Sequence, residues 1–210
     1  MPLSSRLVLQ VLFATAALGF YLPAHSAGDP ARGKERSYTC LGCHGIPDYK
    51  NVYPTYSVPE LGGQHPGYIV AALKEYKAGQ RAHATMHQQA ASLTDQDMED
   101  IAAYFGSDAL KPTSKPIGTP PAKVTLCASC HGQNGIGITD DYPDLAGQHA
   151  DYIARALHEY KHGDRKNAIM PAFAGPLSDE DIEQIADYFS RQAPPLHTLK
   201  RRTTFLSSVN

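Results

Sequence analysis

Four cysteines stand in two matching arrangements, each followed directly by a histidine: Cys40-Leu-Gly-Cys43-His44 and Cys127-Ala-Ser-Cys130-His131. Two thiols three positions apart on a helical turn can each add to one vinyl group of the same haem, and the histidine can then bind the iron from below. A Cys-x-x-Cys pair can also form a thioredoxin-like redox centre, a structural zinc site or disulfides. The histidine after both pairs favours two covalently bound haem c groups.

A methionine on the other face of each iron would complete its coordination and raise the haem potential. After the initiator the methionines are Met86, Met98 and Met170. Met98 falls on the apolar face of a predicted helix and is expected in the core. Met86 and Met170 are expected in loops between helices and are the predicted sixth ligands. His83 and His87 flank Met86 and remain alternatives for the first haem.

Two prolines precede matched leucines and could support the iron-binding histidines. A metal-bound histidine usually donates its second N–H to an acceptor that fixes the orientation of the ring. The carbonyl groups of Pro59 and Pro143 are the predicted acceptors for His44 and His131. The alternative is that each proline only begins a turn.

Other matched polar residues have more than one interpretation. Arg81 and Arg165 are candidates for pairing with haem propionates, because a guanidinium group suits carboxylates. A position on the surface or between the two halves is the alternative. His65 and His149 are expected to satisfy a turn or a helix start rather than to bind iron.

The chain contains an internal repeat. Leu61-Gly-Gly-Gln-His65 recurs as Leu145-Ala-Gly-Gln-His149, an offset of 84 residues (145 minus 61) that also maps Met86 on Met170. The cysteine motifs are offset by 87 (127 minus 40), so the first copy carries additional residues after its motif. The predicted organisation is a signal peptide at 1–27, a first domain at 28–110, a Pro-rich linker at 111–122, a second domain at 123–195 and a C-terminal tail at 196–210.

Both halves have helical patterns. Apolar residues at 69, 72, 73 and 76 follow the period of a helix, which Gly79 is expected to end. The second half repeats this pattern at 153–160 before Gly163. Later helices begin at capping-box pairs, Thr94 with Asp97 and Ser178 with Asp181. A short helix is expected at 29–39, and the fold class is all-α.

The N-terminus and the overall charge indicate the compartment. A positive start, an apolar stretch through 7–22 and small residues near 27 predict a cleaved signal peptide, with an uncleaved anchor as the alternative. The formal net charge is −2. Nucleic-acid binding would call for a basic face, and this class is therefore excluded. We expect export to the periplasm.

These motifs, in this order from about residue 30 to about 192, resemble the dihaem cytochrome c4 family. The resemblance implies two tandem class I cytochrome c domains related by pseudo-twofold symmetry, with propionate edges near their interface. It also implies a periplasmic carrier, loosely associated with the membrane surface, that takes electrons from the quinol-oxidising respiratory chain to a terminal oxidase. Carried over residue by residue, it assigns one haem to Cys40, Cys43, His44 and Met86, and the other to Cys127, Cys130, His131 and Met170.

Two departures from the family pattern affect the interface and the docking surface. The first half has Ile46 to Tyr53 and additional residues in place of a Gly-rich segment, and the second half has only the Pro-rich linker before Cys127.

An iron with six protein-derived bonds has no vacant position for a substrate, and so electron transfer is expected rather than catalysis. The partners are then redox proteins, with a respiratory complex as donor and a terminal oxidase as acceptor. One alternative is the haem subunit of a periplasmic dehydrogenase. A dihaem peroxidase is another, but the two matched methionines weigh against it.

Overall fold

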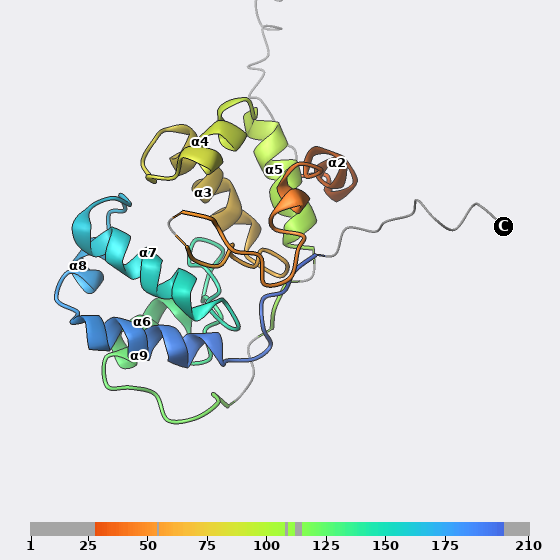
Figure 1. Ribbon diagram of the computed structural model, residues 1–210. Coiled ribbons are helices and arrows are strands. Elements are labelled where there is room, and N and C mark those ends of the chain that lie inside the picture. The colour runs from red at the N-terminus through yellow and green to blue at the C-terminus, as the bar shows by residue number, and fades with distance from the viewer. Residues whose placement is uncertain (1–27, 54, 108, 112–114, 200–210) are drawn as a thin grey trace, which may run out of the picture.

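The computed structural model describes residues 28–199 apart from 54, 108 and 112–114 (Figure 1). The predicted signal peptide at 1–27 and most of the predicted tail, 200–210, lie outside the described residues. The elements in chain order are α2 (Pro30–Arg36), the 3-10 helix η1 (Cys40–Gly42), α3 (Pro66–Lys77), α4 (Ala84–Ala91), α5 (Asp95–Phe105), α6 (Val124–His131), α7 (Ala150–His162), α8 (Met170–Ala174) and α9 (Asp179–Ser190). Extended pairing within these described residues is confined to isolated bridges.

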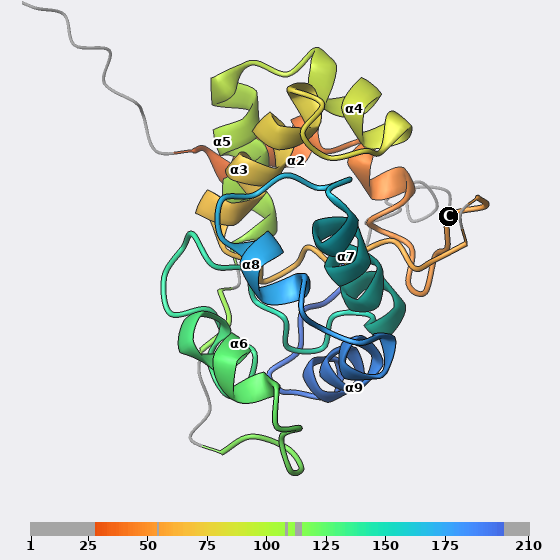
Figure 2. The same ribbon diagram turned by 90° about the vertical axis from the view of Figure 1, so that its left-hand side faces the viewer.

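The helices form two halves that follow the internal repeat (Figure 1). In the first half α5 packs against α2 and α3, and in the second half α7 packs against α9 and α8. Figure 2, turned by 90°, shows the same two halves stacked on each other. The all-α prediction is therefore confirmed for the described residues.

Each half has its own hydrophobic core, and the two cores use equivalent positions. The first contains Met98, Ile101 and Phe105, and the second contains Ile182, Ile185 and Phe189 at an offset of 84 (182 minus 98). Met98 is 0% exposed, as expected for a core residue rather than a ligand.

The long helices begin where their capping residues predict. Thr94 and Ser178 each cap a helix with a complete capping box, made with Asp97 and Asp181 respectively. α7 ends at His162 and is followed by Gly163, which has φ 83°, a left-handed value that glycine adopts without steric cost.

The prediction that Met86 and Met170 lie in loops is wrong, because Met86 is the third residue of α4 and Met170 is the first residue of α8. In α4, the His83 ring accepts a hydrogen bond from the Met86 N–H (3.2 Å). In α8, the Asn167 side chain accepts from the Met170 N–H (3.0 Å). These two short helices are set by local caps, and their apolar pattern is too brief to reveal a helical period.

The predicted N-terminal helix is shorter than 29–39. It begins after Asp29, whose side chain accepts from the Ala31 N–H, and it ends at Arg36. Gly33 allows it to pack against α5, because a Cβ atom at Gly33 would lie 1.8 Å from the Asp100 carbonyl oxygen.

The two halves meet in an antiparallel backbone contact. Arg81 and Arg165, which are equivalent in the repeat, form an isolated bridge. On either side of it, Lys166 N donates to Gln80 O (2.9 Å) and Ala82 N donates to Asp164 O (3.2 Å). Exchanging the halves maps this arrangement onto itself, as the expected pseudo-twofold relation requires.

The segment after the second half returns to the first. His197 and Gly62 exchange two backbone hydrogen bonds, at 2.9 and 3.0 Å. Leu199 packs against the first core, so this segment also ties the halves together.

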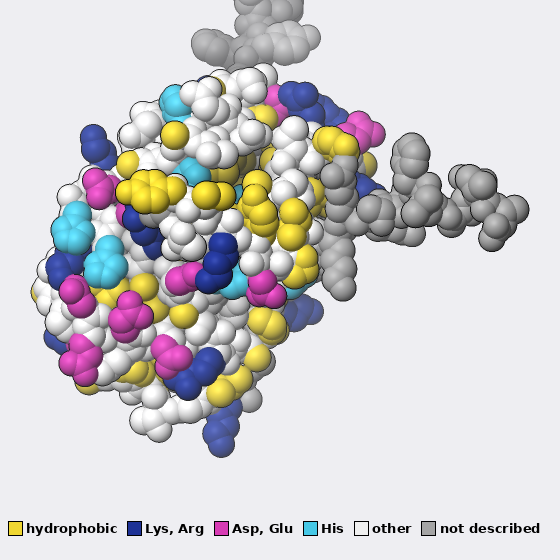
Figure 3. Space-filling model, in the orientation of Figure 1, with side chains coloured by type: hydrophobic (Ala, Val, Ile, Leu, Met, Phe, Trp, Pro, Cys, Tyr) yellow, Lys and Arg dark blue, Asp and Glu magenta, His cyan; other side chains and the backbone are white. Residues whose placement is uncertain are grey.

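The helices between residues 28 and 199 that the structure describes are all too short or too polar to cross a membrane. On the face shown in Figure 3, acidic and basic side chains are interspersed.

Candidate functional site

Both cysteine motifs lie on tight helical turns. In the first half the turn is η1, and the His44 N–H donates to Cys40 O (2.8 Å). In the second half the motif occupies the end of α6. All four thiols are free and partly buried. Each pair can therefore form two thioether bonds at one edge of a haem.

The histidine of each motif is held by a backbone carbonyl group. His44 Nδ1 lies 2.9 Å from Pro59 O, and His131 Nδ1 lies 2.9 Å from Pro143 O. A carbonyl oxygen only accepts, so the proton is on Nδ1, and Nε2 keeps the lone pair that binds a metal. Burial lowers the pKa of both imidazoles and keeps them neutral.

In each half a cysteine and a methionine lie against the same hydrophobic core. Cys40 and Met86 pack on the first core, and Cys127 and Met170 pack on the second. One cysteine and the predicted methionine ligand of each half therefore lie on the same core.

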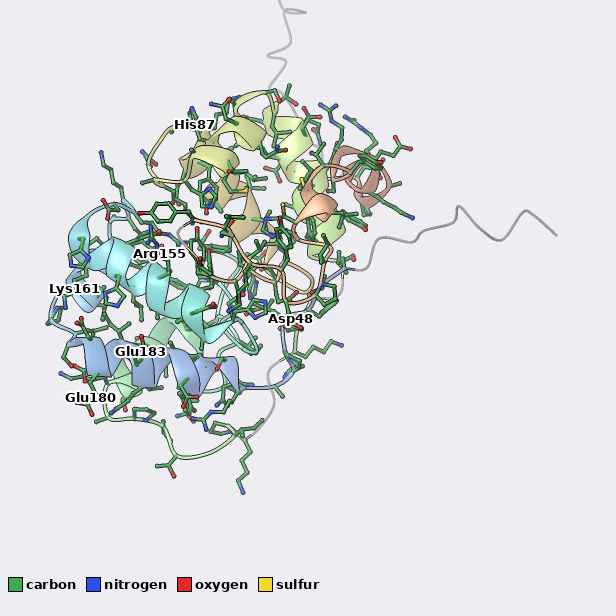
Figure 4. The ribbon with its side chains drawn as sticks, viewed as in Figure 1. Asp48, His87, Arg155, Lys161, Glu180 and Glu183 are labelled. Carbon is green, nitrogen blue, oxygen red and sulfur yellow. The ribbon has the colours of Figure 1, made fainter. Side chains whose placement is uncertain are left out.

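The two histidines beside Met86 have other partners. His83 Nδ1 accepts from the Met86 N–H (3.2 Å), which places its proton on Nε2 and leaves no lone pair for iron. His87 Nδ1 lies 2.8 Å from Tyr76 O, and Figure 4 shows His87 at the edge of the first half away from the second. The His83 contact therefore argues against that residue as a ligand, whereas the His87 contact leaves its Nε2 free. Met86 is favoured over His87 because the Met86 side chain packs on the same core as Cys40.

Arg81 and Arg165 are buried between the halves, 4% and 3% exposed. Arg81 pairs with Glu75, with 2.5 Å between Nε and Oε2. The equivalent glutamate, Glu159, pairs instead with Arg155, which Figure 4 shows on α7 facing the first half. Arg165 forms no ion pair with any of the described residues.

The guanidinium group of Arg165 is incompletely satisfied. Its Nη2 donates to the Tyr68 hydroxyl (2.8 Å), but its buried Nε has no hydrogen-bond partner among the described residues. Burial opposes ionisation of Tyr68, yet the charges of Arg81 and Arg165 outweigh it and lower the pKa of Tyr68 to about 8. A buried cation without a carboxylate is costly, so this site suits an anionic group such as a haem propionate.

His65 and His149 stand at the starts of α3 and α7, but their side chains do not cap these helices. His65 lies between two carboxylates of the second half, 3.0 Å from Asp140 and 2.9 Å from Asp144. His149 Nε2 lies 3.4 Å from Glu60 of the first half. Both residues therefore stand at helix starts as expected, but their side chains form ion pairs across the interface instead of capping the helices.

Two functional candidates were missing from the sequence prediction. Gln64 and Gln148 are 3% and 4% exposed and bind backbone groups of the opposite half. The repeated Gly-Gln-His sequence marked both glutamines as matched residues. The sequence alone did not indicate that each would bind a segment of the opposite half.

The residues present fit two covalent haem groups. Each half offers paired thiols, a neutral imidazole with a free ring nitrogen and a thioether sulfur beside one apolar core. The orphaned Arg165 Nε adds a buried cationic site at the interface. This donor set is the one that c-type haem requires.

Family models match both halves. Residues 30–107 match the model described as Cytochrome c, and residues 123–189 match the model described as Cytochrome C oxidase, cbb3-type, subunit III.

Similar proteins match most of the chain. Cytochrome c4 of Pseudomonas aeruginosa is 33% identical, and the match covers 88% of this chain and 97% of that protein. A thiosulfate dehydrogenase electron acceptor of Stutzerimonas stutzeri is 28% identical, over 84% of this chain and 87% of the relative. The crystal structure of reduced recombinant cytochrome c4 from Pseudomonas stutzeri is 32% identical, with a TM-score of 0.62 over 79% of this chain and 100% of that one.

Proposed function

Because the chain belongs to the cytochrome c4 family, we propose that it carries electrons in the periplasm from a quinol-oxidising respiratory complex to a terminal oxidase. The chain has two tandem cytochrome c domains, two covalently bound haem c groups and the character of a dihaem electron carrier.

The residues proposed to hold the haems are symmetric in the repeat. Thioether bonds form at Cys40 and Cys43 in the first half and at Cys127 and Cys130 in the second; the axial ligands are His44 with Met86, and His131 with Met170. The observation that carries this assignment is the pair of equal hydrogen bonds, 2.9 Å each, from the two histidines to Pro59 and Pro143.

The protein residues hold the haems and control access to them. Each haem iron supplies one-electron oxidation and reduction. With one oriented histidine and one methionine as its ligands, each iron would have no open coordination position. Substrates are excluded from the iron, and electron transfer rather than catalysis is the expected activity.

Arg81 and Arg165 have a proposed role at the interface. The two guanidinium groups bring positive charge into a buried region, and the Arg165 Nε still lacks a partner there. We expect a haem propionate to supply that partner, because a charge-assisted bond to a carboxylate would offset the cost of the buried cation.

The test uses the exported holoprotein. Mass spectrometry should find two added haem masses, and optical and EPR redox titrations should find low-spin iron in both oxidation states with a methionine-to-iron charge-transfer band. Stopped-flow mixing should then show reduction by a quinol-oxidising complex and reoxidation by a terminal oxidase. High-spin iron, or rapid cyanide binding at one haem, would favour a peroxidase instead.

A second candidate donor is a dehydrogenase. It is favoured by the relative described as a thiosulfate dehydrogenase electron acceptor, which matches 84% of this chain. Faster reduction by a thiosulfate dehydrogenase than by the quinol-oxidising complex in the same experiment would favour this candidate. Both candidates require the same haem sites, so the kinetics of reduction distinguish them.

A further inference from the structure

One peptide group in the first half links the proposed axial histidine to the other half. Its carbonyl group, from Pro59, accepts from His44 Nδ1 (2.9 Å). Its N–H group, from Glu60, donates to the side-chain oxygen of Gln148 (3.0 Å). A single planar amide therefore stands between His44 of the first half and Gln148 of the second.

The second half contains the same arrangement in reverse. The Pro143 carbonyl oxygen lies 2.9 Å from His131 Nδ1, and the Asp144 N–H donates to the side-chain oxygen of Gln64 (2.9 Å). Gln64 belongs to the first half. Each proposed axial histidine is thus joined through one amide to a glutamine of the opposite half.

Each glutamine binds its partner segment twice. Gln148 Nε2 donates to Glu60 O (3.0 Å), and Gln64 Nε2 donates to Asp144 O (3.0 Å). The side-chain oxygen of each glutamine also accepts from the N–H of the residue that follows it in the sequence. This second bond fixes the orientation of the side-chain amide. A buried side chain with both a donor and an acceptor is needed here, and glutamine provides both.

The two ends of an amide are electronically connected, because its C–N bond has partial double-bond character. A hydrogen bond from the N–H makes the carbonyl oxygen more negative, and successive bonds in such a chain strengthen one another. A stronger acceptor at Pro59 draws the Nδ1 proton of His44 and makes the ring a more electron-rich ligand. An electron-rich ligand favours oxidised iron and lowers the reduction potential.

We propose that Gln148 tunes the reduction potential of the haem in the first half and that Gln64 tunes the haem in the second. This inference rests on the proposed function, because it requires His44 and His131 to bind iron. The two glutamines are positioning residues that act through the carbonyl groups of Pro59 and Pro143. Any partner that moves the halves apart would raise both potentials together.

The test compares Gln148→Met with Gln64→Met, since methionine has nearly the volume of glutamine but cannot make these hydrogen bonds. The potential of each haem is followed through its own hyperfine-shifted haem methyl signals in NMR during a redox titration. Gln148→Met should raise the potential of the first haem and leave the second unchanged, and Gln64→Met should do the reverse. The equilibrium constant for electron distribution between the haems should move about two- to twentyfold, as expected for a change of roughly 10–30% in one hydrogen bond in a low-dielectric interior.

Two further variants separate this role from simple loosening of the interface. Gln148→Glu keeps an acceptor for the Glu60 N–H, so the potential of the first haem should not rise. Ser57→Ala removes the hydrogen bond that the Ser57 hydroxyl donates to the Asp151 carboxylate across the same interface (2.9 Å), without touching either peptide group. It should leave the electron distribution at its wild-type value.

The outcomes distinguish this inference from the proposed function. If the wild type lacks two low-spin haems with histidine and methionine ligands, both are overturned. If the wild type has them and each glutamine variant shifts the haem of its own half, or both haems equally, only the cross-interface tuning is overturned. A rise in the first potential in Gln148→Glu would also overturn it.

Discussion

Replacement of His65 by glutamine should remove a pH dependence from the stability of this protein. In the native structure the His65 ring lies between Asp144 at 2.9 Å and Asp140 at 3.0 Å, both from the opposite half. The two carboxylates raise the pKa of His65 to about 9, and the hydrogen bond to Asp144 is the largest cause of this shift. Glutamine can keep a hydrogen bond but cannot carry the charge.

The sign and size of the effect follow from this shift. Below pH 6.5 the His65 ring is protonated in both the folded and the unfolded chain, and its ion pairs contribute fully to the free energy of unfolding. Between pH 6.5 and about 9 the unfolded chain releases it while the folded protein retains it, so stability falls as the pH rises. One pKa unit corresponds to about 1.4 kcal/mol, which sets an upper limit of about 3 kcal/mol. Solvent screening of these partly exposed groups reduces the expected loss to about 1–2 kcal/mol.

The assay is denaturant unfolding of the wild type and His65→Gln at several pH values from 6 to 9.5, taken as the difference between the two proteins so that other groups cancel. NMR titration of the His65 ring gives its pKa directly. His149→Gln is the matched control, and it should show a smaller change because His149 has one carboxylate partner, at 3.4 Å. A difference that stays constant across this pH range, or a His65 pKa at or below 6.5, would refute the reasoning.

Three other predictions concern the ligands and the helices. Met86→Ala should remove about half of the methionine-to-iron charge-transfer band, and Met170→Ala should remove the other half, as measured by absorption near the red edge of the visible spectrum. An undiminished band in Met86→Ala would indicate that His83 or His87 is the ligand instead. Thr94→Ala breaks a complete capping box and should lower the free energy of unfolding by about 1 kcal/mol, measured by denaturant titration, with Thr94→Ser close to wild type. Phe189→Ala empties a fully buried position and should cost about 3–5 kcal/mol in thermal unfolding, whereas a loss below 1 kcal/mol would show that the second core collapses around it.

Local sequence patterns were sufficient to predict much of the fold. The capping pairs Thr94 with Asp97 and Ser178 with Asp181 marked two helix starts, because a cap depends on residues three positions apart. The short helices that contain Met86 and Met170 were not predicted, because a helix of eight or five residues shows little periodicity.

The sequence by itself determined the chemistry of each half. A Cys-x-x-Cys-His motif, a later methionine and a repeat that presents both twice are sufficient to predict two haem c groups in tandem cytochrome c domains, and the comparisons confirm that prediction. The axial assignments and the domain boundaries remain predictions. All of these features are local in the chain or follow from copying one unit.

Only the tertiary structure decided how the halves act on each other. The Gln64 side chain meets a backbone segment 80 residues away, and His65 meets a carboxylate 79 residues away. Sequence periodicity cannot predict such contacts, because they depend on how the two separately folded cores are oriented relative to each other. Burial is the second reason: a guanidinium group such as that of Arg165 becomes a site for an anion only when packing removes water from it.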